Sequence, residues 1–283
     1  MTSTGTETDG PPVTPDRASP PPLGGDGLLE GRDFAGRQFI GSREVQEDSY
    51  GVVPRAEFAG GPHDLFLVVA DGMGGHAAGE VASSLAVHTF AETFLESGTG
   101  CDSGRLWDCL EEANRRIARE LQTRGDAVRG MGTTLLAVLL RGKSVRWMSV
   151  GDSPLYLIRG NEWQRLNRIH SKATELAEQV QAGKISEEQA RTDPTRHTLL
   201  SALIGESIYD VDDPPPVELI AGDVLIAATD GIETLTHEEI TAVISSLRDQ
   251  DASAIADGLI QAVKSKQSPK QDNATLVVVR MPA

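Results

Sequence analysis

From about Phe39 onward, short apolar runs typical of strands alternate with longer segments in which apolar residues recur at helical spacing. Residues 65–70 are continuously apolar, as expected for a strand that is covered on both faces. Apolar positions recur every three to four residues in 79–94 and again in 106–121, so both segments are predicted to be helices. Further strand signals lie in the stretches TTLLAVLL, SVRWMSVGD, PLYLIRG, DVLIAATDG and ATLVVVRM.

Two later helices carry their own start signals. Residues 171–190 read as helical, with Ser186 and Gln189 forming a capping box for the second half, and Thr236 and Glu239 form another before 238–247. Strands joined by short polar turns, with helices grouped in blocks, indicate antiparallel sheets with segregated helices rather than regular βαβ winding. We therefore expect one α+β domain over residues 33–283.

The N-terminal segment, residues 1–32, has a different composition. It is rich in Thr, Pro and Gly and shows no apolar periodicity, so it cannot bury enough surface to offset its ordering entropy. It also lacks the basic start and apolar stretch of a signal peptide. We predict a disordered tail, for which a docking or phosphorylation role is the functional alternative.

Composition and charge narrow the classes of partner. About 39% of the 283 residues are hydrophobic, enough for a sizeable core, yet no run approaches the ~18 apolar residues of a membrane span. The formal net charge of −16 argues against nucleic acid or an anionic membrane as the main partner. Cys101 and Cys109 fit neither a zinc ribbon nor a disulfide scaffold. We expect two buried thiols and a reducing, cytoplasmic location.

Aspartates recur at the ends of the apolar runs. An ionised carboxylate in such a place is costly unless it is paired or bound to a metal. Each one alone is also compatible with an Asp-Gly hairpin or an Asx turn. Their recurrence predicts convergence at one edge of a sandwich, around a hard cation such as Mg²⁺ or Mn²⁺. The residues in question are Asp48, Asp71, Asp152, Asp230 and Asp272.

The glycines after Asp71 are read as a flexible turn that lets the Gly72 carbonyl approach an ion without a Cβ in the way. Other chemistries fail on spacing, since GMGG is not GxGxxG and no Walker lysine, GxSxG elbow or HExxH motif occurs. A carboxylate-rich site without a nucleophile indicates metal-activated water.

The ordered motifs REVQED, VVADGMGGHAAGE, GMGTTL, VGDSPLY, AATDGI and QDNATLVVV resemble those of the bacterial metal-dependent protein phosphatases, the PPM or type 2C family. The resemblance covers residues 37–281. It implies a four-layer αββα sandwich of two antiparallel β-sheets flanked by helices, with metal ions at one end between the sheets. It also implies a hydrolase that removes phosphate from phosphoserine and phosphothreonine in signalling proteins, opposing a bacterial Ser/Thr kinase.

The same resemblance implies roles for individual residues. Asp71 would bridge two Mn²⁺ or Mg²⁺ ions, whose shared water attacks phosphorus, and Arg43 would clamp the substrate phosphate as a second catalytic residue. A guanidinium fork suits phosphate oxygens. Glu47 and Asp48 would ligate or hold metal-bound waters. The implied metal set is Glu47, Asp48, Asp71, Gly72, Asp230 and Asp272.

Several positions depart from the family pattern. Met73 stands where eukaryotic members have a histidine, so a water or His76 would have to protonate the leaving oxygen, and His76 could equally cap a turn. Pro154 replaces the usual Arg after GDS, and Ile169 replaces an Asp. Many members place a third-metal ligand where this chain has Ala127, next to Asp126, which puts a third metal site in doubt.

Two alternatives to an active protein phosphatase stay open. A catalytically silent, phosphatase-like module that binds phosphoproteins would fit the departures, whereas the retained aspartates favour an enzyme. A phosphatase of small phosphorylated metabolites is the other. Residues 171–203 resemble the mobile flap of bacterial members, which argues against a small-molecule site. We expect this segment to select substrates, with a surface hairpin that makes no substrate contact as the alternative.

Overall fold

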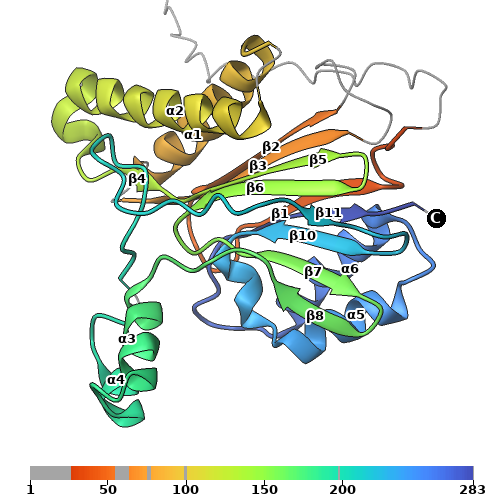
Figure 1. Cartoon of the computed structure of the whole chain (residues 1–283). Helices are drawn as coiled ribbons and strands as arrows, with labels where there is room; N and C mark the ends of the chain where they lie inside the picture. Colours follow the sequence, from red (N-terminus) through yellow and green to blue (C-terminus); the bar gives the residue numbers. More distant parts are fainter. Residues whose placement is uncertain (1–26, 55–63, 75–77, 99–100, 197, 283) are drawn as a thin grey trace, which may run out of the picture.

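The computed structural model describes residues 27–54, 64–74, 78–98, 101–196 and 198–282. Two sheets lie face to face between two pairs of helices, so the predicted αββα sandwich is confirmed (Figure 1). Of the predicted disordered tail, residues 1–32, the part up to residue 26 lies outside the described residues. Residues 27–32 are described, and Leu28 packs against the core between the sheets.

The first sheet has the order β2-β3-β5-β6-β9, and every pairing in it is antiparallel. A short strand, β4, also pairs with β3. The strands are β2 (Asp48–Pro54), β3 (Leu65–Met73), β4 (Gly132–Thr133), β5 (Leu135–Arg141), β6 (Ser144–Val150) and β9 (Val217–Glu218).

The second sheet has the order β1-β11-β10-β7-β8 and is likewise antiparallel throughout. Its last strand, β8, was not predicted, because its residues are largely exposed and lack an apolar run. The strands are β1 (Phe34–Phe39), β7 (Leu155–Arg159), β8 (Glu162–Arg165), β10 (Val224–Ala228) and β11 (Ala274–Arg280).

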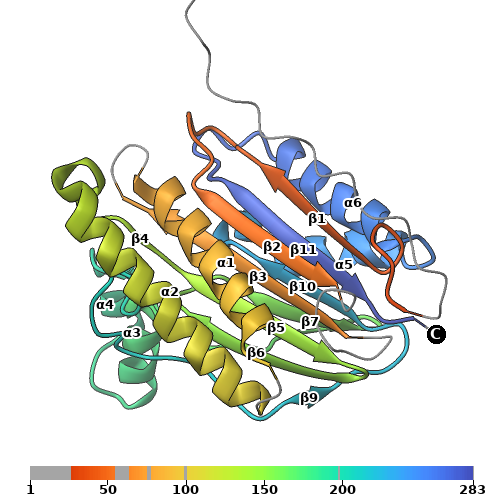
Figure 2. The same ribbon diagram turned by 90° about the horizontal axis from the view of Figure 1, so that it is seen from above.

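Helices cover the outer face of each sheet. The pair α1 (Ala78–Glu96) and α2 (Asp102–Arg124) lies across the first sheet, as Figure 2 shows, and is followed by the 3-10 turn η2 (Gly125–Val128). The second sheet is covered by α5 (His237–Ser246) and α6 (Ala252–Ser265), and η3 (Asp230–Thr234) precedes α5. The 14-residue helix α6 was not predicted. Among the described residues, no helix combines the length and apolar character needed to cross a bilayer.

Strand β3 shows how the sequence divides the core into layers. Alternate side chains of a strand point to opposite faces. Leu65, Leu67 and Val69 therefore pack between the two sheets, whereas Phe66 and Val68 pack under α1 and α2. The continuous apolar run arises because both faces of β3 are covered, as the sequence predicted.

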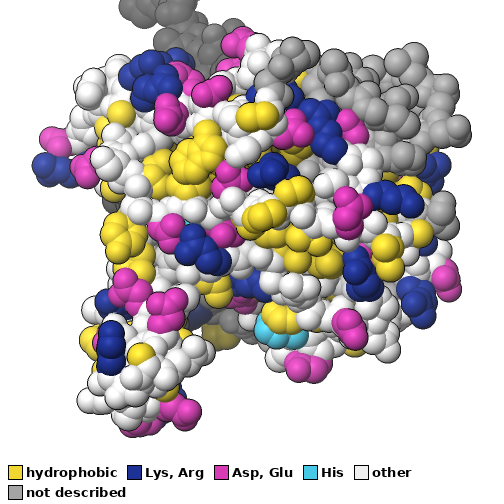
Figure 3. All heavy atoms as spheres, viewed as in Figure 1, with side chains coloured by type: hydrophobic (Ala, Val, Ile, Leu, Met, Phe, Trp, Pro, Cys, Tyr) yellow, Lys and Arg dark blue, Asp and Glu magenta, His cyan; other side chains and the backbone are white. Residues whose placement is uncertain are grey.

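Residues 172–196 form a projection that stands away from the sandwich (Figures 1 and 3), whereas Ser201 and Leu203, at the end of the segment 171–203, are buried. The helix predicted over 171–190 is in fact two helices, α3 (Lys172–Gln181) and α4 (Glu187–Thr192), because the chain turns at Gly183, whose φ is +67°. The capping boxes predicted for α4 and α5 are both present. On the face that Figure 3 shows, basic and acidic side chains are interspersed.

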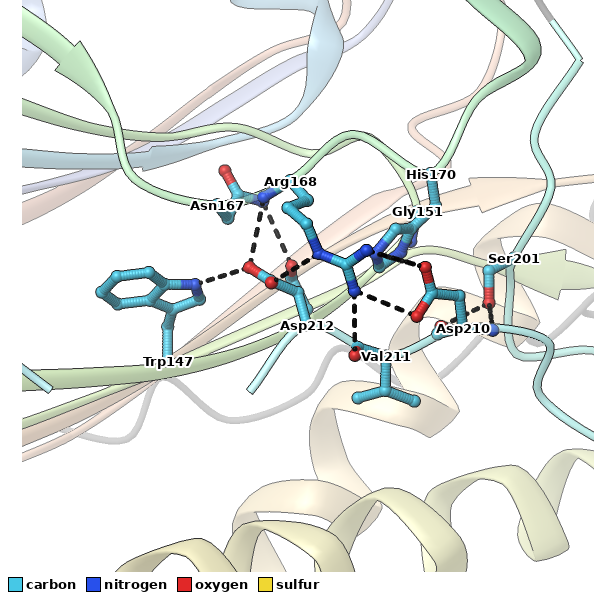
Figure 4. A network of polar contacts seen from close by, with 10 residues as sticks. Trp147, Gly151, Asn167, Arg168, His170, Ser201, Asp210, Val211 and Asp212 are labelled. Carbon is cyan, nitrogen blue, oxygen red and sulfur yellow. Dashed lines mark hydrogen bonds and ion pairs between the residues drawn. The ribbon is translucent and has the colours of Figure 1, made fainter. Parts of the chain in front are cut away.

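A polar network holds the base of this projection to the first sheet (Figure 4). Arg168 donates to the carboxylates of both Asp210 and Asp212, and Asp212 also accepts from the indole Nε1 of Trp147. His170 accepts from the Gly151 backbone N–H at its Nδ1 atom, 3.1 Å away. Charge-assisted hydrogen bonds therefore fix the point at which the projection leaves the sandwich.

The cysteines differ from each other. Cys109 is buried in the core under α2, as expected, but Cys101 is exposed as the N-cap of that helix, so the prediction of two buried thiols was wrong for Cys101. Its thiol faces solvent because an N-cap lies at the helix end, outside the apolar stripe that packs on the sheet. Both cysteines are free.

Candidate active site

The strand ends bring the predicted carboxylates together at one end of the sandwich. Asp48 begins β2 and lies directly across from Asp71 of β3 in the antiparallel register. Thr229, at the end of β10 in the other sheet, donates its hydroxyl to Asp48 Oδ2 at 2.8 Å. Asp230 follows Thr229, and Asp272 lies two residues before β11. Both sheets thus contribute acidic residues to the same end of the sandwich.

The charges of these carboxylates are strongly coupled. Burial raises the pKa of Asp71 well above its ordinary value, and Asp48, Asp230, Asp152 and Asp272 raise it further. Burial, followed by Asp152 and Asp272, raises the pKa of Asp230 to about 7. The pKa of Asp48 rises to about 6, again chiefly through burial, although the hydroxyl of Thr229 lowers it. Negative charge is therefore concentrated in a small volume that lacks enough water to solvate it.

Gly72 lies in a strand, and not in a flexible turn as the sequence analysis expected. Strand β3 continues through Gly72 to Met73, which pair with Thr133 and Gly132 of β4, and the chain turns only at Gly74, where φ is +144°. A Cβ on Gly72 would lie far inside the contact distance of the Gly79 and Glu47 carbonyl oxygens. Glycine is required because three chain segments meet there, which holds the Asp71–Gly72 pair rigid.

Arg43 lies at the same end of the sandwich, beside Asp272. Its side chain is 51% exposed and its Nη2 donates to Asp272 Oδ2 at 2.6 Å. This hydrogen bond and the charge of Asp272 raise the pKa of the guanidinium, which stays charged. A cation is therefore held beside the acidic cluster with part of its surface open to solvent.

The donor set fits a hard divalent cation. Within the described residues, no three Asp, Glu, His or Cys side chains are already gathered closely enough to hold a metal ion. Glu47 Oε1 is nevertheless buried without a hydrogen bond of ordinary geometry among the described residues. Burial raises the pKa of that carboxyl group, and the nearby Gly79 backbone N–H only partly offsets the rise. A bound Mg²⁺ or Mn²⁺ would give such buried oxygen atoms a partner and would offset the negative charge of the neighbouring carboxylates.

The structure adds supporting residues that the sequence analysis did not assign. Asn273 accepts from the Glu47 backbone N–H at 2.8 Å and donates to the Ile40 carbonyl, which fixes the loop after β1. The Thr134 hydroxyl accepts from the Asp71 backbone N–H. Their motifs, DN and GMGTT, were visible in the sequence, but their partners lie more than 60 residues away. Asp152, seen at a strand end but left out of the metal set, belongs to the coupled cluster.

Two further expectations concern positions around the site. His76, the proposed alternative to a water as proton donor, lies outside the described residues. Asp126, next to Ala127 at the place of a third-metal ligand, is exposed on η2 and pairs with Arg129 at 3.6 Å. The structure thus leaves Asp126 in an exposed surface pair.

Comparisons with known proteins agree with this arrangement. The family profile for protein phosphatase 2C matches residues 35–271. The serine/threonine phosphatase stp of Listeria welshimeri is 32% identical over 242 residues, which are 84% of this chain and 90% of that protein. The serine/threonine protein phosphatase PstP of Mycobacterium tuberculosis strain H37Rv is 33% identical over 213 residues, which are 75% of this chain but 39% of PstP.

Solved structures give the same answer. A crystal structure of Mycobacterium tuberculosis PstP superposes with a TM-score of 0.73 at 30% identity, covering 88% of this chain and 98% of that one. The PstP catalytic domain in complex with two manganese ions superposes with a TM-score of 0.69 at 30% identity, with the same coverage of both chains.

Proposed function

Since this chain belongs to the protein phosphatase 2C family, we propose that its metal-dependent serine/threonine phosphatase activity arises at the open end of the sandwich described above. The proposed metal set is the one expected from the sequence. Asp71 and the Gly72 carbonyl would hold the two ions. Asp230 and Asp272 would complete the set, and Glu47 and Asp48 would ligate or hold water. The PstP catalytic domain binds two manganese ions, which supports a two-ion site for Mn²⁺ or Mg²⁺, since both suit the same oxygen donors.

When bound, the two ions supply an acidified water as nucleophile and positive charge for the phosphoryl oxygens. The residues of the chain set the geometry for this reaction. The rigid strand of β3 holds Asp71, and the hydroxyl of Thr229 holds Asp48 from the opposite sheet. These contacts fix the Asp71 backbone and the Asp48 carboxylate in place, whereas the remaining carboxylates would gather around the ions on binding.

Arg43 is proposed to bind the phosphate group of the substrate. Its side chain is partly exposed, and its Nη2 atom donates a hydrogen bond to Asp272 in this metal-free structure. A phosphoester oxygen offers the same kind of acceptor and a stronger charge, so it competes for these donors in a bidentate contact. Arg43 thereby orients phosphorus toward the carboxylate cluster and neutralises charge that develops on its oxygens.

One observation carries the assignment: Asp48 lies opposite Asp71 in the register of β2 on β3 and is hydrogen-bonded at 2.8 Å by Thr229, the neighbour of Asp230 in the other sheet. We would measure phosphate release from a phosphothreonine peptide in Mn²⁺ and in EDTA, for wild type and Asp71→Asn. Turnover is expected only with Mn²⁺, and the variant should be about three orders of magnitude slower. Undiminished activity in EDTA would refute the assignment. Mn²⁺-dependent peptide binding without turnover would instead support the silent phosphoprotein-binding module.

The physiological substrates are proposed to be cytoplasmic signalling proteins that a bacterial Ser/Thr kinase phosphorylates. The support is the naming of relatives as serine/threonine phosphatases. The α3–α4 projection is proposed to contribute to substrate selection, because it is attached beside the loop that carries Asp152. Deleting 172–198 tests this. Activity on phosphopeptides should change while hydrolysis of 4-nitrophenyl phosphate is kept, and equal changes for both substrates would contradict a selecting role.

A further inference from the structure

Arg165, the last residue of β8, is a largely buried cation beside the carboxylate cluster. Its side chain is 13% exposed, and its guanidinium makes two directed contacts. Nη2 donates to the backbone carbonyl of Asp152 at 2.5 Å, and Nη1 donates to Glu233 Oε1 at 3.0 Å. The same Glu233 oxygen accepts from the hydroxyl of Tyr156 at 2.8 Å.

These contacts join two chain segments that carry acidic residues of the cluster. Asp152 lies in the loop between β6 and β7, whereas Glu233 lies on η3, three residues after Asp230. We propose that Arg165 is a positioning residue that sets the spacing of Asp152 and Asp230, and thereby the affinity of the site for divalent metal ions. This inference rests on the proposed function of the same site.

The buried position of the guanidinium supports this role over that of a surface ion pair. Its Nε is buried without a partner among the described residues, a cost that the two Nη contacts must offset. Pro154, two residues after Asp152, stands where the resemblance led us to expect an arginine. In this chain a guanidinium reaches the same loop from the neighbouring strand, since Arg165 pairs with Tyr156 across β7 and β8.

Positioning and simple electrostatics predict opposite results. Removing the charge of Arg165 makes the cluster more negative, which by Coulomb attraction alone would strengthen cation binding. If Arg165 positions the two segments, its removal instead weakens binding, because the carboxylates lose their fixed spacing. Groups that hold ligands in place typically contribute about 10- to 100-fold to metal affinity.

The test uses the full chain after EDTA treatment, with Mn²⁺ binding measured by calorimetry and unfolding followed by circular dichroism. Arg165→Met should weaken Mn²⁺ binding about 10- to 100-fold, and Arg165→Lys should recover part of it. Arg159→Met is the matched control. It breaks the contact with Asp223 on the adjacent strand and should lower stability but not Mn²⁺ affinity. If Arg165→Met fails to fold, Arg165→Gln, which keeps hydrogen-bond donors but loses the charge, should also weaken binding, whereas loss of charge alone would strengthen it.

Unchanged or tighter Mn²⁺ binding by folded Arg165→Met would overturn the positioning role. A wild-type chain that binds no Mn²⁺ would contradict the proposed function itself, so the two failures are distinguishable.

A separate observation concerns an apolar shelf made of Met73 and Ile204. Met73 lies two residues after Asp71 on β3, so its side chain points to the same face about 7 Å further along the strand. Gly132 of β4 pairs with Met73, and a Cβ there would lie 2.8 Å from Ile204 Cγ2 and 3.4 Å from Met73 Cγ. Ile204 is 39% exposed, although it is large and apolar.

We infer that this shelf receives an apolar side chain of the substrate, two or three residues from the phosphorylated one. The shelf continues the strand that carries Asp71, and an extended peptide advances about 3.3 Å per residue, so two to three residues span that distance. Burying an exposed apolar side chain against Ile204 removes both surfaces from water. This inference also rests on the proposed function.

The test compares two phosphothreonine peptides that differ only in Leu or Ser at the second position from the phosphorylated residue, whose side chain points to the same side in an extended peptide. We expect kcat/KM to be about 10-fold higher for the Leu peptide. Ile204→Ser should abolish the ratio. Ile220→Ser should keep it, since Ile220 is 52% exposed and follows β9, away from the β4 segment. Equal hydrolysis of both peptides by wild type would overturn the shelf, whereas hydrolysis of neither would contradict the phosphatase function.

Discussion

Replacing Thr229 with valine tests how the two sheets cooperate at the site. Thr229 is completely buried, and its hydroxyl donates to Asp48 Oδ2 at 2.8 Å while accepting from the Thr275 backbone N–H at 2.9 Å. Valine has nearly the same shape but offers neither contact. The variant therefore removes one hydrogen bond that crosses between the sheets and a second one, to the Thr275 backbone, within the second sheet.

The size of the effect follows from the charge on the acceptor. A hydrogen bond to an ionised group contributes about 1.5–3 kcal/mol, and 1.36 kcal/mol corresponds to one pKa unit. The pKa of Asp48 is about 6 in the metal-free chain, and the Thr229 hydroxyl lowers it. Its loss should raise that pKa by about 1–2 units, so roughly half or more of Asp48 becomes protonated at pH 7.

Mn²⁺ affinity measured between pH 6 and pH 8.5 provides the readout. At pH 7 the dissociation constant of Thr229→Val should be about 2- to 10-fold higher than that of wild type, and the difference should shrink toward pH 8.5. Thr241→Val, which removes only an exposed hydroxyl bonded to the His237 carbonyl within α5, serves as control. Superimposable pH profiles for wild type and Thr229→Val would refute the reasoning.

Three further outcomes are expected. The pKa values of Asp48 and Asp230 lie above that of an unfolded aspartate, so the metal-free fold binds more protons than the unfolded chain. Its Tm should therefore rise as the pH falls from about 8 to 5, and a Tm that falls over this range would contradict the prediction. Gly72→Ala should lose several kcal/mol in urea unfolding, because its Cβ has no room; a loss below about 1 kcal/mol would show that the segments can part. Iodoacetamide should label the exposed Cys101 and spare Cys109, because burial raises the pKa of the Cys109 thiol to about 12. Mass spectrometry would detect the label, and equal labelling of both cysteines would mean that the helix opens.

Local patterns in the sequence determined much of the framework. The two-sided apolar run of β3 predicted a strand covered on both faces, and the capping boxes of α4 and α5 were found where Ser186 and Thr236 placed them. These features depend on residues that are close together in the sequence, so the sequence alone is enough to predict them. Motif order likewise indicated the family, which the comparisons confirm.

Only the tertiary structure decided which side chains lie close together at the site. Asp48 meets Asp71 because of the register of β2 on β3, and it meets Thr229, 181 residues away, only because the sheets stack. Arg165 reaches Asp152 from a strand that has no apolar signature. The coupling between charges depends on distance and desolvation, and both are properties of the packed sandwich. Spacing along the chain does not encode them.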